Sequence, residues 1–222
     1  MRKLLVTLAL IANSATGLAE ERSGGWSGVL EEVVVTAQKR EERIQDTPIS
    51  ATAFTGDAMR ELGFDSSLEV ATQTPGLQMA QNFGEGNIPV VSIRGVGLID
   101  FSEHNESPSA IYVDEVYKAN LSGLDFQLFD LERAEVLRGP QGTLFGRNAT
   151  GGLVHYVTAK PSQEMDGYVE AGFGDRGRTK FEGAIGGGFD EGVSGRLSAL
   201  YHKHDGYYDN AFPGGEDGNQ LD

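Results

Sequence analysis

The sequence contains no cysteine, a single tryptophan and far fewer basic than acidic residues. The absence of cysteine excludes disulfide bonds, but exported bacterial proteins do not require them, so the compartment stays open. With 18 basic and 33 acidic residues, the net charge of −15 repels phosphate backbones and argues against a nucleic-acid partner. Runs of about eighteen consecutive apolar residues are also missing, so the sequence predicts no transmembrane helix.

Glycine, in contrast, is abundant: the 31 glycines are about twice the usual share. The segment RGPQGTLFGRNATGG, from Arg138 to Gly152, is especially rich in it. Its glycines are Gly139, Gly142, Gly146, Gly151 and Gly152. A phosphate-binding P-loop has four residues between two glycines, followed by Lys and then Ser or Thr. Neither this spacing nor the dinucleotide pattern G-x-G-x-x-G occurs in the segment, so we expect no phosphate site there.

The first residues of the chain indicate export. Arg2 and Lys3 precede an apolar run over residues 4–12, and small residues follow up to Ala19. A charged start, an apolar run and a small-residue site are the successive parts of a secretory signal peptide. The apolar run is too short to span a bilayer. We therefore expect residues 1–19 to be a signal peptide that is cleaved after Ala19.

A short β-branched segment, VVVTA, lies within a polar leader that we place at residues 20–46 and expect to be flexible. The segment consists of Val33, Val34, Val35, Thr36 and Ala37. A strand flanked by charged chain would be an exposed edge, which folded proteins usually avoid. The pattern fits two interpretations equally well. Either the segment is the first strand of the next domain, or it is kept free so that a partner's sheet can take it up as an added strand.

Helix and strand patterns alternate over residues 47–161. A short helix is predicted over residues 56–62, ended by Gly63, and a second one begins at a capping box formed by Ser66 and Glu69. Strands are predicted at residues 49–54, 90–94, 110–117, 133–137 and 153–158. This mixture predicts a small α+β domain. No nucleophile–base set or carboxylate pair stands out, so we expect neither an enzyme nor a metal or cofactor site.

The hydrophobic period changes to two after Pro161. Alternating segments occur at residues 168–173, 181–185 and 193–201. Alternating strands that end in an aromatic residue are typical of the wall of a membrane β-barrel. A soluble β-sandwich alternates in the same way, so the alternation by itself leaves both architectures open.

Five stretches of the chain, taken in order, resemble one family. They are EEVVVTAQKREERIQDTPIS, PVVSIRGVG, AIYVDEVY, DLERAEVLRGPQGTLFGRNATGG and VTAKP, within residues 31–161. Together they resemble the TonB-dependent outer-membrane receptors, in which an N-terminal α+β plug lies inside a barrel of about 22 strands. The resemblance implies a plug at residues 47–161. It also implies the first three antiparallel barrel strands and the start of a loop at residues 162–222.

The resemblance implies roles for particular residues. Residues 33–37 match the TonB box, which the TonB energy-coupling complex grasps. Arg94 and Arg138 match plug arginines that pair with glutamates of the barrel wall, and a guanidinium binds a carboxylate in bidentate fashion. The glycine-rich loop matches a plug segment inside the barrel, where a missing Cβ permits turns and close contacts. The family usually has glycine where Glu115 stands, which leaves the turn geometry there open.

For function, the resemblance implies a receptor of the cell outer membrane that binds an extracellular small molecule and admits it to the periplasm. An iron–siderophore is the commonest ligand of the family, but vitamin B12, sugars and other metals also occur. The expected partners are the TonB complex, the ligand and outer-membrane lipid. The alternatives are a soluble exported binding or adhesion module and a truncated, non-functional receptor fragment.

Three wall strands leave two open sheet edges, and in a bilayer every edge N–H and C=O must find a partner away from water. We therefore expect these 222 residues to be the N-terminal part of a longer receptor. The expected lipid-facing stripe includes Val169, Phe173, Ile185 and Leu197.

Overall fold

The computed structural model describes residues 33–37, 39–40, 42–81, 89–98, 105–120, 124 and 126–206. The expected signal peptide, the leader ahead of Val33 and the expected loop from residue 207 onward lie outside these residues.

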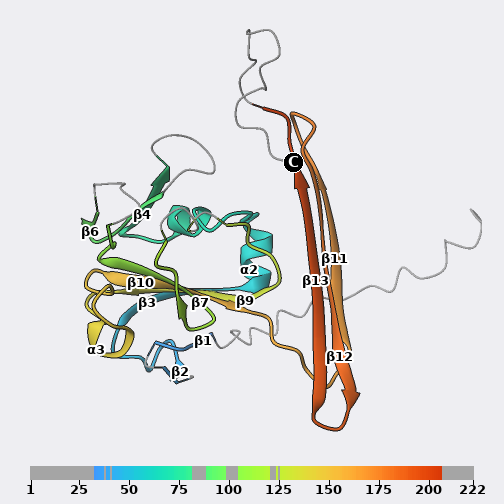
Figure 1. The fold of residues 1–222 in the computed structure, drawn as a ribbon, viewed down its shortest axis with the longest axis horizontal. Helices are drawn as coiled ribbons and strands as arrows, with labels where there is room; N and C mark the ends of the chain where they lie inside the picture. The colour runs from blue at the N-terminus through green and yellow to red at the C-terminus, as the bar shows by residue number, and fades with distance from the viewer. Residues whose placement is uncertain are drawn as a thin grey trace, which may run out of the picture. The chain divides into compact units, whose positions relative to one another are not determined.

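A five-stranded sheet forms the centre of the α+β domain (Figure 1). Its strands follow the order β3-β9-β10-β7-β8; β10 and β7 are parallel, and the other neighbours are antiparallel. These strands are β3 (Ser50–Thr55), β9 (Leu131–Arg138), β10 (Gly152–Thr158), β7 (Ser109–Val113) and β8 (Val116–Tyr117). β9 and β10 are buried on both faces, which explains the nearly continuous apolar runs in their sequences.

Short helices and a second sheet cover one face of the central sheet. They are α2 (Gly56–Glu61), the 3-10 helix η1 (Glu69–Gln73), β4 (Leu77–Gln81), β5 (Pro89–Ile93) and β6 (Val96–Gly97). Met59, Val70 and Ile93 from these elements pack with Val136 and Tyr156 of the central sheet into one core.

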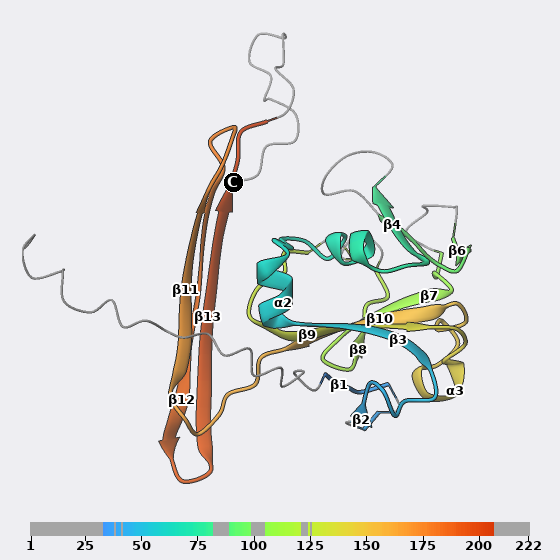
Figure 2. The ribbon, with the colours of Figure 1, turned by 180° about the vertical axis from the view of Figure 1, so that it is seen from behind.

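The opposite face of the central sheet is covered by β1 (Val34–Val35), β2 (Glu42–Arg43) and the single turn α3 (Gly142–Phe145). Figures 1 and 2 show these three elements on the side of the sheet away from α2 and β4. The strands of the central sheet are therefore sandwiched between two apolar layers.

Local sequence accounts for the first helix. Thr55 caps α2, its Oγ1 accepting the N–H of Ala58 at 3.2 Å, and Gly63 follows its end with a φ of 71°. The second predicted helix is the 3-10 helix η1 rather than an α-helix. The carboxylate of Glu69 accepts the backbone N–H of Ser66 at 3.1 Å, which is one half of the predicted capping box.

The strand predicted over residues 110–117 is in fact a hairpin of β7 and β8. Asp114 and Glu115 both have positive φ, 46° and 69°, as a two-residue hairpin turn requires. The Asp114 carboxylate accepts the N–H and the hydroxyl of Thr158, at 2.9 and 2.8 Å, which holds the turn. Glu115 thus adopts a backbone conformation that usually favours glycine, and the chain turns at the position where the resemblance had left the turn geometry open.

Three long antiparallel strands follow the α+β domain, in the order β11-β12-β13. They are β11 (Asp166–Phe173), β12 (Thr179–Asp190) and β13 (Val193–Lys203), and each contains one of the alternating segments. The expected apolar stripe lies on their exposed face. The exposed fractions are 90% for Val169, 76% for Phe173, 60% for Ile185 and 73% for Leu197. The opposite face carries buried charged residues, Lys180 and Glu182.

The fold class expected from the sequence, an α+β domain followed by antiparallel strands, is confirmed. Within the part of the chain that the structure describes, no helix is both long and apolar enough to cross a membrane.

Candidate functional site

The predicted TonB box, residues 33–37, is packed against the central sheet. β1 pairs with β2 in antiparallel register, with Val34 opposite Arg43. Val35 and Ala37 are fully buried, whereas Val34 is 36% exposed. The sequence left open a strand of the next domain and a strand kept free for a partner; in this structure residues 33–37 lie packed on the α+β domain, and they are called the docked segment.

The docked segment shares an apolar cluster with the central sheet and α3. The buried members of this cluster are Val35, Ala37, Ala110, Tyr112, Leu137, Phe145, Ala149 and Leu153. Full burial of a valine side chain is worth about 1.5–3 kcal/mol. Release of the segment would expose Val35 and Ala37 together, so the loss of apolar packing already opposes release.

A buried carboxylate holds the middle of the docked segment. Glu135 of β9 is fully buried, and its Oε1 accepts the N–H of Thr36 at 2.9 Å and the Thr36 hydroxyl at 3.0 Å. Arg133 donates its Nε–H to the same carboxylate at 2.7 Å and pairs with Glu132 through Nη1. The carboxylate charge is therefore balanced inside the protein, as a buried charge requires.

His155 of β10 completes this polar cluster. Its Nε2 lies 3.2 Å from the N–H of Glu115, and its Nδ1 lies 3.2 Å from Oγ1 of Thr36. Because an Nε2 that accepts a hydrogen bond carries no proton, the neutral ring has its proton on Nδ1 and donates it to Thr36. The Thr36 hydroxyl then donates to Glu135. The ring is 2% exposed, and burial lowers the pKa of His155 below its usual value.

Arg138, one of the two predicted lock residues, binds three acceptors within the α+β domain. Its Nε donates to Oγ of Ser50 at 3.1 Å, its Nη1 to the carbonyl of Pro75 at 3.1 Å, and its Nη2 to the carbonyl of Ala51 at 3.2 Å. The guanidinium therefore links β3 to the turn that precedes β4, a role that the sequence did not indicate.

Replacing Arg138 with alanine is expected to lower the free energy of unfolding by about 1–2 kcal/mol, because several half-exposed hydrogen bonds are lost. Hydrogen exchange in the full-length receptor should become faster in β3 and around Pro75. Arg138→Lys is the matched control: it keeps the charge, but one ammonium cannot span all three acceptors, so it should recover little. Unchanged exchange in both places would contradict the role as a link.

Arg94, the second predicted lock residue, follows β5 with a φ of 53° and is exposed. Its backbone N–H donates to the carbonyl of Gly76 at 2.7 Å. Within the described residues its guanidinium makes no hydrogen bond or ion pair, and it lies beside Gly139. The two predicted lock residues thus differ. The guanidinium of Arg138 already makes three hydrogen bonds within the described residues, whereas that of Arg94 makes none there.

The glycine-rich loop connects β9 to β10 through α3. Gly139, Gly146 and Gly152 have φ values of 104°, 88° and 141°, which side chains rarely adopt. A Cβ on Gly151 would lie 2.8 Å from Cβ of Val96, and one on Gly152 only 2.3 Å from the carbonyl of Leu137. At Gly142 a Cβ would meet open space, so that glycine marks the start of α3 without being required by packing.

A nearly buried ion pair joins the α+β domain to β13. The Nε of Arg196 donates to both carboxylate oxygens of Asp130, at 3.0 and 2.8 Å, and its Nη1 pairs with Asp166. The side chains of Asp130 and Arg196 are 8% and 10% exposed. Here the α+β domain supplies the carboxylate and the strand supplies the guanidinium, which is the reverse of the predicted lock.

A second group of charges joins the same parts. Lys180 of β12 lies 3.0 Å from Asp65 and 2.9 Å from Glu182, and Arg178 also pairs with Asp65. The Tyr168 hydroxyl donates to Glu182. Again a carboxylate of the α+β domain is bound by cations, here from β12 and from the turn that precedes it.

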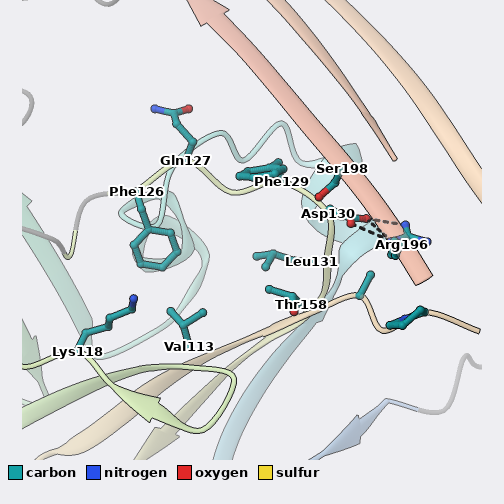
Figure 3. Close-up of a pocket in the computed structure, with 12 residues that line it drawn as sticks. Val113, Lys118, Phe126, Gln127, Phe129, Asp130, Leu131, Thr158, Arg196 and Ser198 are labelled. Carbon is teal, nitrogen blue, oxygen red and sulfur yellow. Dashed lines mark hydrogen bonds and ion pairs between the residues drawn. The ribbon is translucent and has the colours of Figure 1, made fainter. Parts of the chain in front are cut away.

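A cavity of about 590 Å³ lies next to the Asp130–Arg196 pair (Figure 3). Its lining is largely apolar and includes Val113, Phe126, Phe129 and Leu131 from the α+β domain. Figure 3 shows the ion pair at one end of this cavity, with Arg196 and Ser198 coming from β13. Within the described residues no group of three or more metal-ligating side chains is gathered, in the cavity or elsewhere.

Comparison with known proteins shows the family. Residues 43–153 match the TonB-dependent Receptor Plug Domain. The chain is 30% identical over 213 residues to the pesticin receptor of Yersinia pestis, covering 95% of this chain and 30% of that protein. It is 29% identical over 146 residues to the vitamin B12 transporter BtuB of Vibrio vulnificus strain CMCP6, covering 64% of this chain and 23% of that protein.

Solved structures agree with this relationship. The ferric yersiniabactin uptake receptor FyuA from Yersinia pestis superposes with a TM-score of 0.68 at 28% identity, over 78% of this chain and 27% of that one. The pyoverdine outer membrane receptor FpvA from Pseudomonas aeruginosa PAO1 has a TM-score of 0.67 at 22% identity, over 79% and 25% of the two chains, and shows the shared fold.

The chain spans less than a third of the length of these relatives. The plug match covers half of the chain, and the relatives and structures extend the likeness beyond it. The protein is accordingly one of the outer membrane, and the chain belongs to the family of TonB-dependent receptors.

Proposed function

We propose that the chain supplies the export signal, coupling segment, plug and first wall strands of a receptor that takes up a scarce solute into the periplasm. The TonB complex would drive uptake by pulling on residues 33–37. The division into residues 1–19, 20–46, 47–161 and 162–222 is part of this proposal. Relatives are named as a vitamin B12 transporter and as a ferric yersiniabactin uptake receptor, which supports a transporter rather than an enzyme.

The observation that carries the proposal is the pairing of the docked segment. Residues 33–37 lie ahead of the plug and form a β-branched strand that shares only two register pairs with β2. The N–H of Thr36 donates to a side chain, Glu135, rather than to a neighbouring strand. Once that bond opens, the backbone of the segment can pair with a strand of a partner, as β-augmentation requires.

The proposed ligand is an iron–siderophore, because a relative at 28% identity is named for the uptake of ferric yersiniabactin. The proposed partners are the TonB complex, this ligand and outer-membrane lipid. Arg94 is our first candidate for a lock to a wall glutamate, because within the described residues its guanidinium has no acceptor. For Arg138 the same lock would require exchange of its bonds to Ser50, Ala51 and Pro75.

Replacing Val34 with proline in the full-length receptor is expected to abolish uptake and leave ligand binding at the cell surface nearly unchanged. Proline removes one backbone donor and fixes φ, so a partner strand cannot pair across that position. Val34 is the exposed side chain of the docked segment, so Val35 and Ala37 keep their packing. The measurement is uptake of radiolabelled iron, supplied with a panel of ferric siderophores, in cells lacking other receptors.

Val34→Thr is the matched control, because it keeps the N–H and the β-branched shape, and it should transport normally. Normal uptake by Val34→Pro would refute the assignment of the coupling segment. Recovery of the full-length protein from the soluble periplasmic fraction would favour the alternative of a soluble exported binding module.

A further inference from the structure

His155 lies where the docked segment, the central sheet and the β7–β8 turn meet. It is directly opposite Glu135 in the register of β10 and β9. Both ring nitrogens are engaged, Nε2 by the N–H of Glu115 and Nδ1 by the hydroxyl of Thr36. Only the neutral ring with its proton on Nδ1 satisfies both contacts, because the backbone N–H of Glu115 can only donate.

We propose that His155 makes docking of residues 33–37 depend on pH: the neutral imidazole holds the segment on the plug, and proton uptake by His155 releases it. This inference rests on the proposed function, since release matters only if the segment is the one that TonB grasps. It names the residue that regulates access to the segment.

Proton uptake would convert Nε2 into a donor that faces the N–H of Glu115 at 3.2 Å. The hydrogen bond from Glu115 would be lost, and two donors would oppose each other in a buried site, while the Nδ1–H bond to Thr36 would remain. Release of the segment would therefore follow from the cost of the buried charge and the opposed donors, which opening the site to water relieves. The new charge would also lie in a ring that is 2% exposed, next to the aromatic ring of Tyr112 at a centroid distance of 6.4 Å.

The charged groups around the ring do not reverse this outcome. On β9, Glu135 favours the imidazolium and Arg133 opposes it; in the β7–β8 turn, Asp114 and Glu115 favour it. Glu135 lies 3.9 Å from Nδ1 and already accepts from Arg133 and Thr36, so it is largely compensated. Burial outweighs these carboxylates and lowers the pKa of His155.

The sign of the pH dependence follows from this lowered pKa. Because Nδ1 faces Thr36 of the docked segment, we expect release of the segment to open the ring to water and to return its pKa toward the ordinary value of about 6.5. The released state therefore binds more protons than the docked state. Docking is fully stable above about pH 6.5 and weakens as the pH falls below it, and the ratio of released to docked segment rises by up to about tenfold per pH unit.

A nitroxide label tests this in the full-length receptor in lipid nanodiscs. These 222 residues contain no cysteine, so Val34→Cys places a label on the exposed residue of the segment. The mobile fraction of the spectrum should rise as the pH falls from about 8 to about 5. A label at Glu61→Cys, which is exposed on α2, reports any general loosening of the plug and should stay unchanged.

His155→Gln is the decisive variant, because its amide oxygen can accept from the N–H of Glu115 but does not titrate in this range. Its segment mobility should be flat across the same pH range. His155→Asn serves the same purpose if the first variant is not recovered. A flat profile in the wild type, or an unchanged pH slope in either variant, would overturn the proposal.

Binding of the isolated periplasmic domain of TonB, measured at the same pH values, separates the two proposals. If that domain binds but the label shows no pH dependence, the inference fails and the proposed function stands. If the label responds as expected through His155 and the domain never binds, the role of residues 33–37 in coupling fails instead.

Discussion

Replacing Glu135 with alanine is expected to release residues 33–37 and to lower the free energy of unfolding of the plug by about 3–5 kcal/mol. The change removes the acceptor of the Thr36 N–H and hydroxyl and leaves Arg133, whose side chain is 6% exposed, without its buried partner. Breaking a buried ion pair by removing one member costs this much because a charge stays behind uncompensated. Denaturant unfolding and the mobility of a label at residue 34 measure the two effects.

Glu132→Ala is the matched control, because Glu132 also pairs with Arg133 but is 44% exposed. Its loss should cost less than about 1 kcal/mol. Glu135→Gln should fall between the two, since it keeps one acceptor oxygen. Equal effects of Glu135→Ala and Glu132→Ala would show that the buried carboxylate does not hold the segment.

Removing the charge of Asp130 is expected to have the second large effect, a loss of about 3–5 kcal/mol in the stability of the plug within the barrel. Asp130→Asn suits the test, because Asp130 has a φ of 50° and asparagine tolerates this backbone. The variant leaves Arg196, 10% exposed, with only Asp166 as a charged partner. Hydrogen exchange of β9 and β10 in the full-length receptor should become markedly faster.

Asp166→Asn is the control, since Asp166 also pairs with Arg196 but its side chain is 61% exposed. This substitution should lower the stability by less than about 1 kcal/mol. Combining Asp130→Asn with Arg196→Gln should cost less than the two single changes added together, because the pair acts as one unit. Additive effects would mean that the two side chains contribute independently.

The strands of the wall and the first helix could be read from local sequence. Alternation with period two marks β11, β12 and β13, and Gly63 with its left-handed φ marks the end of α2. Both signals come from residues close together in the chain. Side chains alternate between the two faces of a strand, and glycine readily adopts the left-handed conformation that ends a helix, so the local sequence shows both.

The docked segment could not be read in this way. Thr36 reaches Glu135 and His155 across 99 and 119 residues of sequence, and no local pattern encodes such contacts. A signal was nevertheless present. Glu135 stands in the run AEVL and His155 in the run LVHYV, where the neighbouring residues are mostly apolar, and buried residues of these two types need partners.

The β7–β8 turn was absent from the local strand pattern for a different reason, although the resemblance placed a turn at Glu115. Its residues Asp114 and Glu115 include no glycine, so the usual marker of a positive φ is absent. The turn is fixed instead by Thr158, which lies 44 residues away and binds the Asp114 carboxylate. Similarly, the acceptors of Arg138 come from β3 and the Pro75 turn, which only the fold brings together.

The lengths of the strand pairings have a mechanical consequence. β1 shares two register pairs with β2, whereas β3, the next strand along the chain, shares six with β9. β1 and β2 are antiparallel, so Val33 lies at the open end of their hairpin. A force applied there opens the two pairs one after the other and then the bonds of Thr36 to Glu135. It reaches the six pairs between β3 and β9 only after residues 36–49 have been extended. The pairing of β1 with β2 is therefore weaker than the pairing of β3 with β9, and the two are loaded in sequence. A pull can extend the first residues of the plug while the central sheet stays folded.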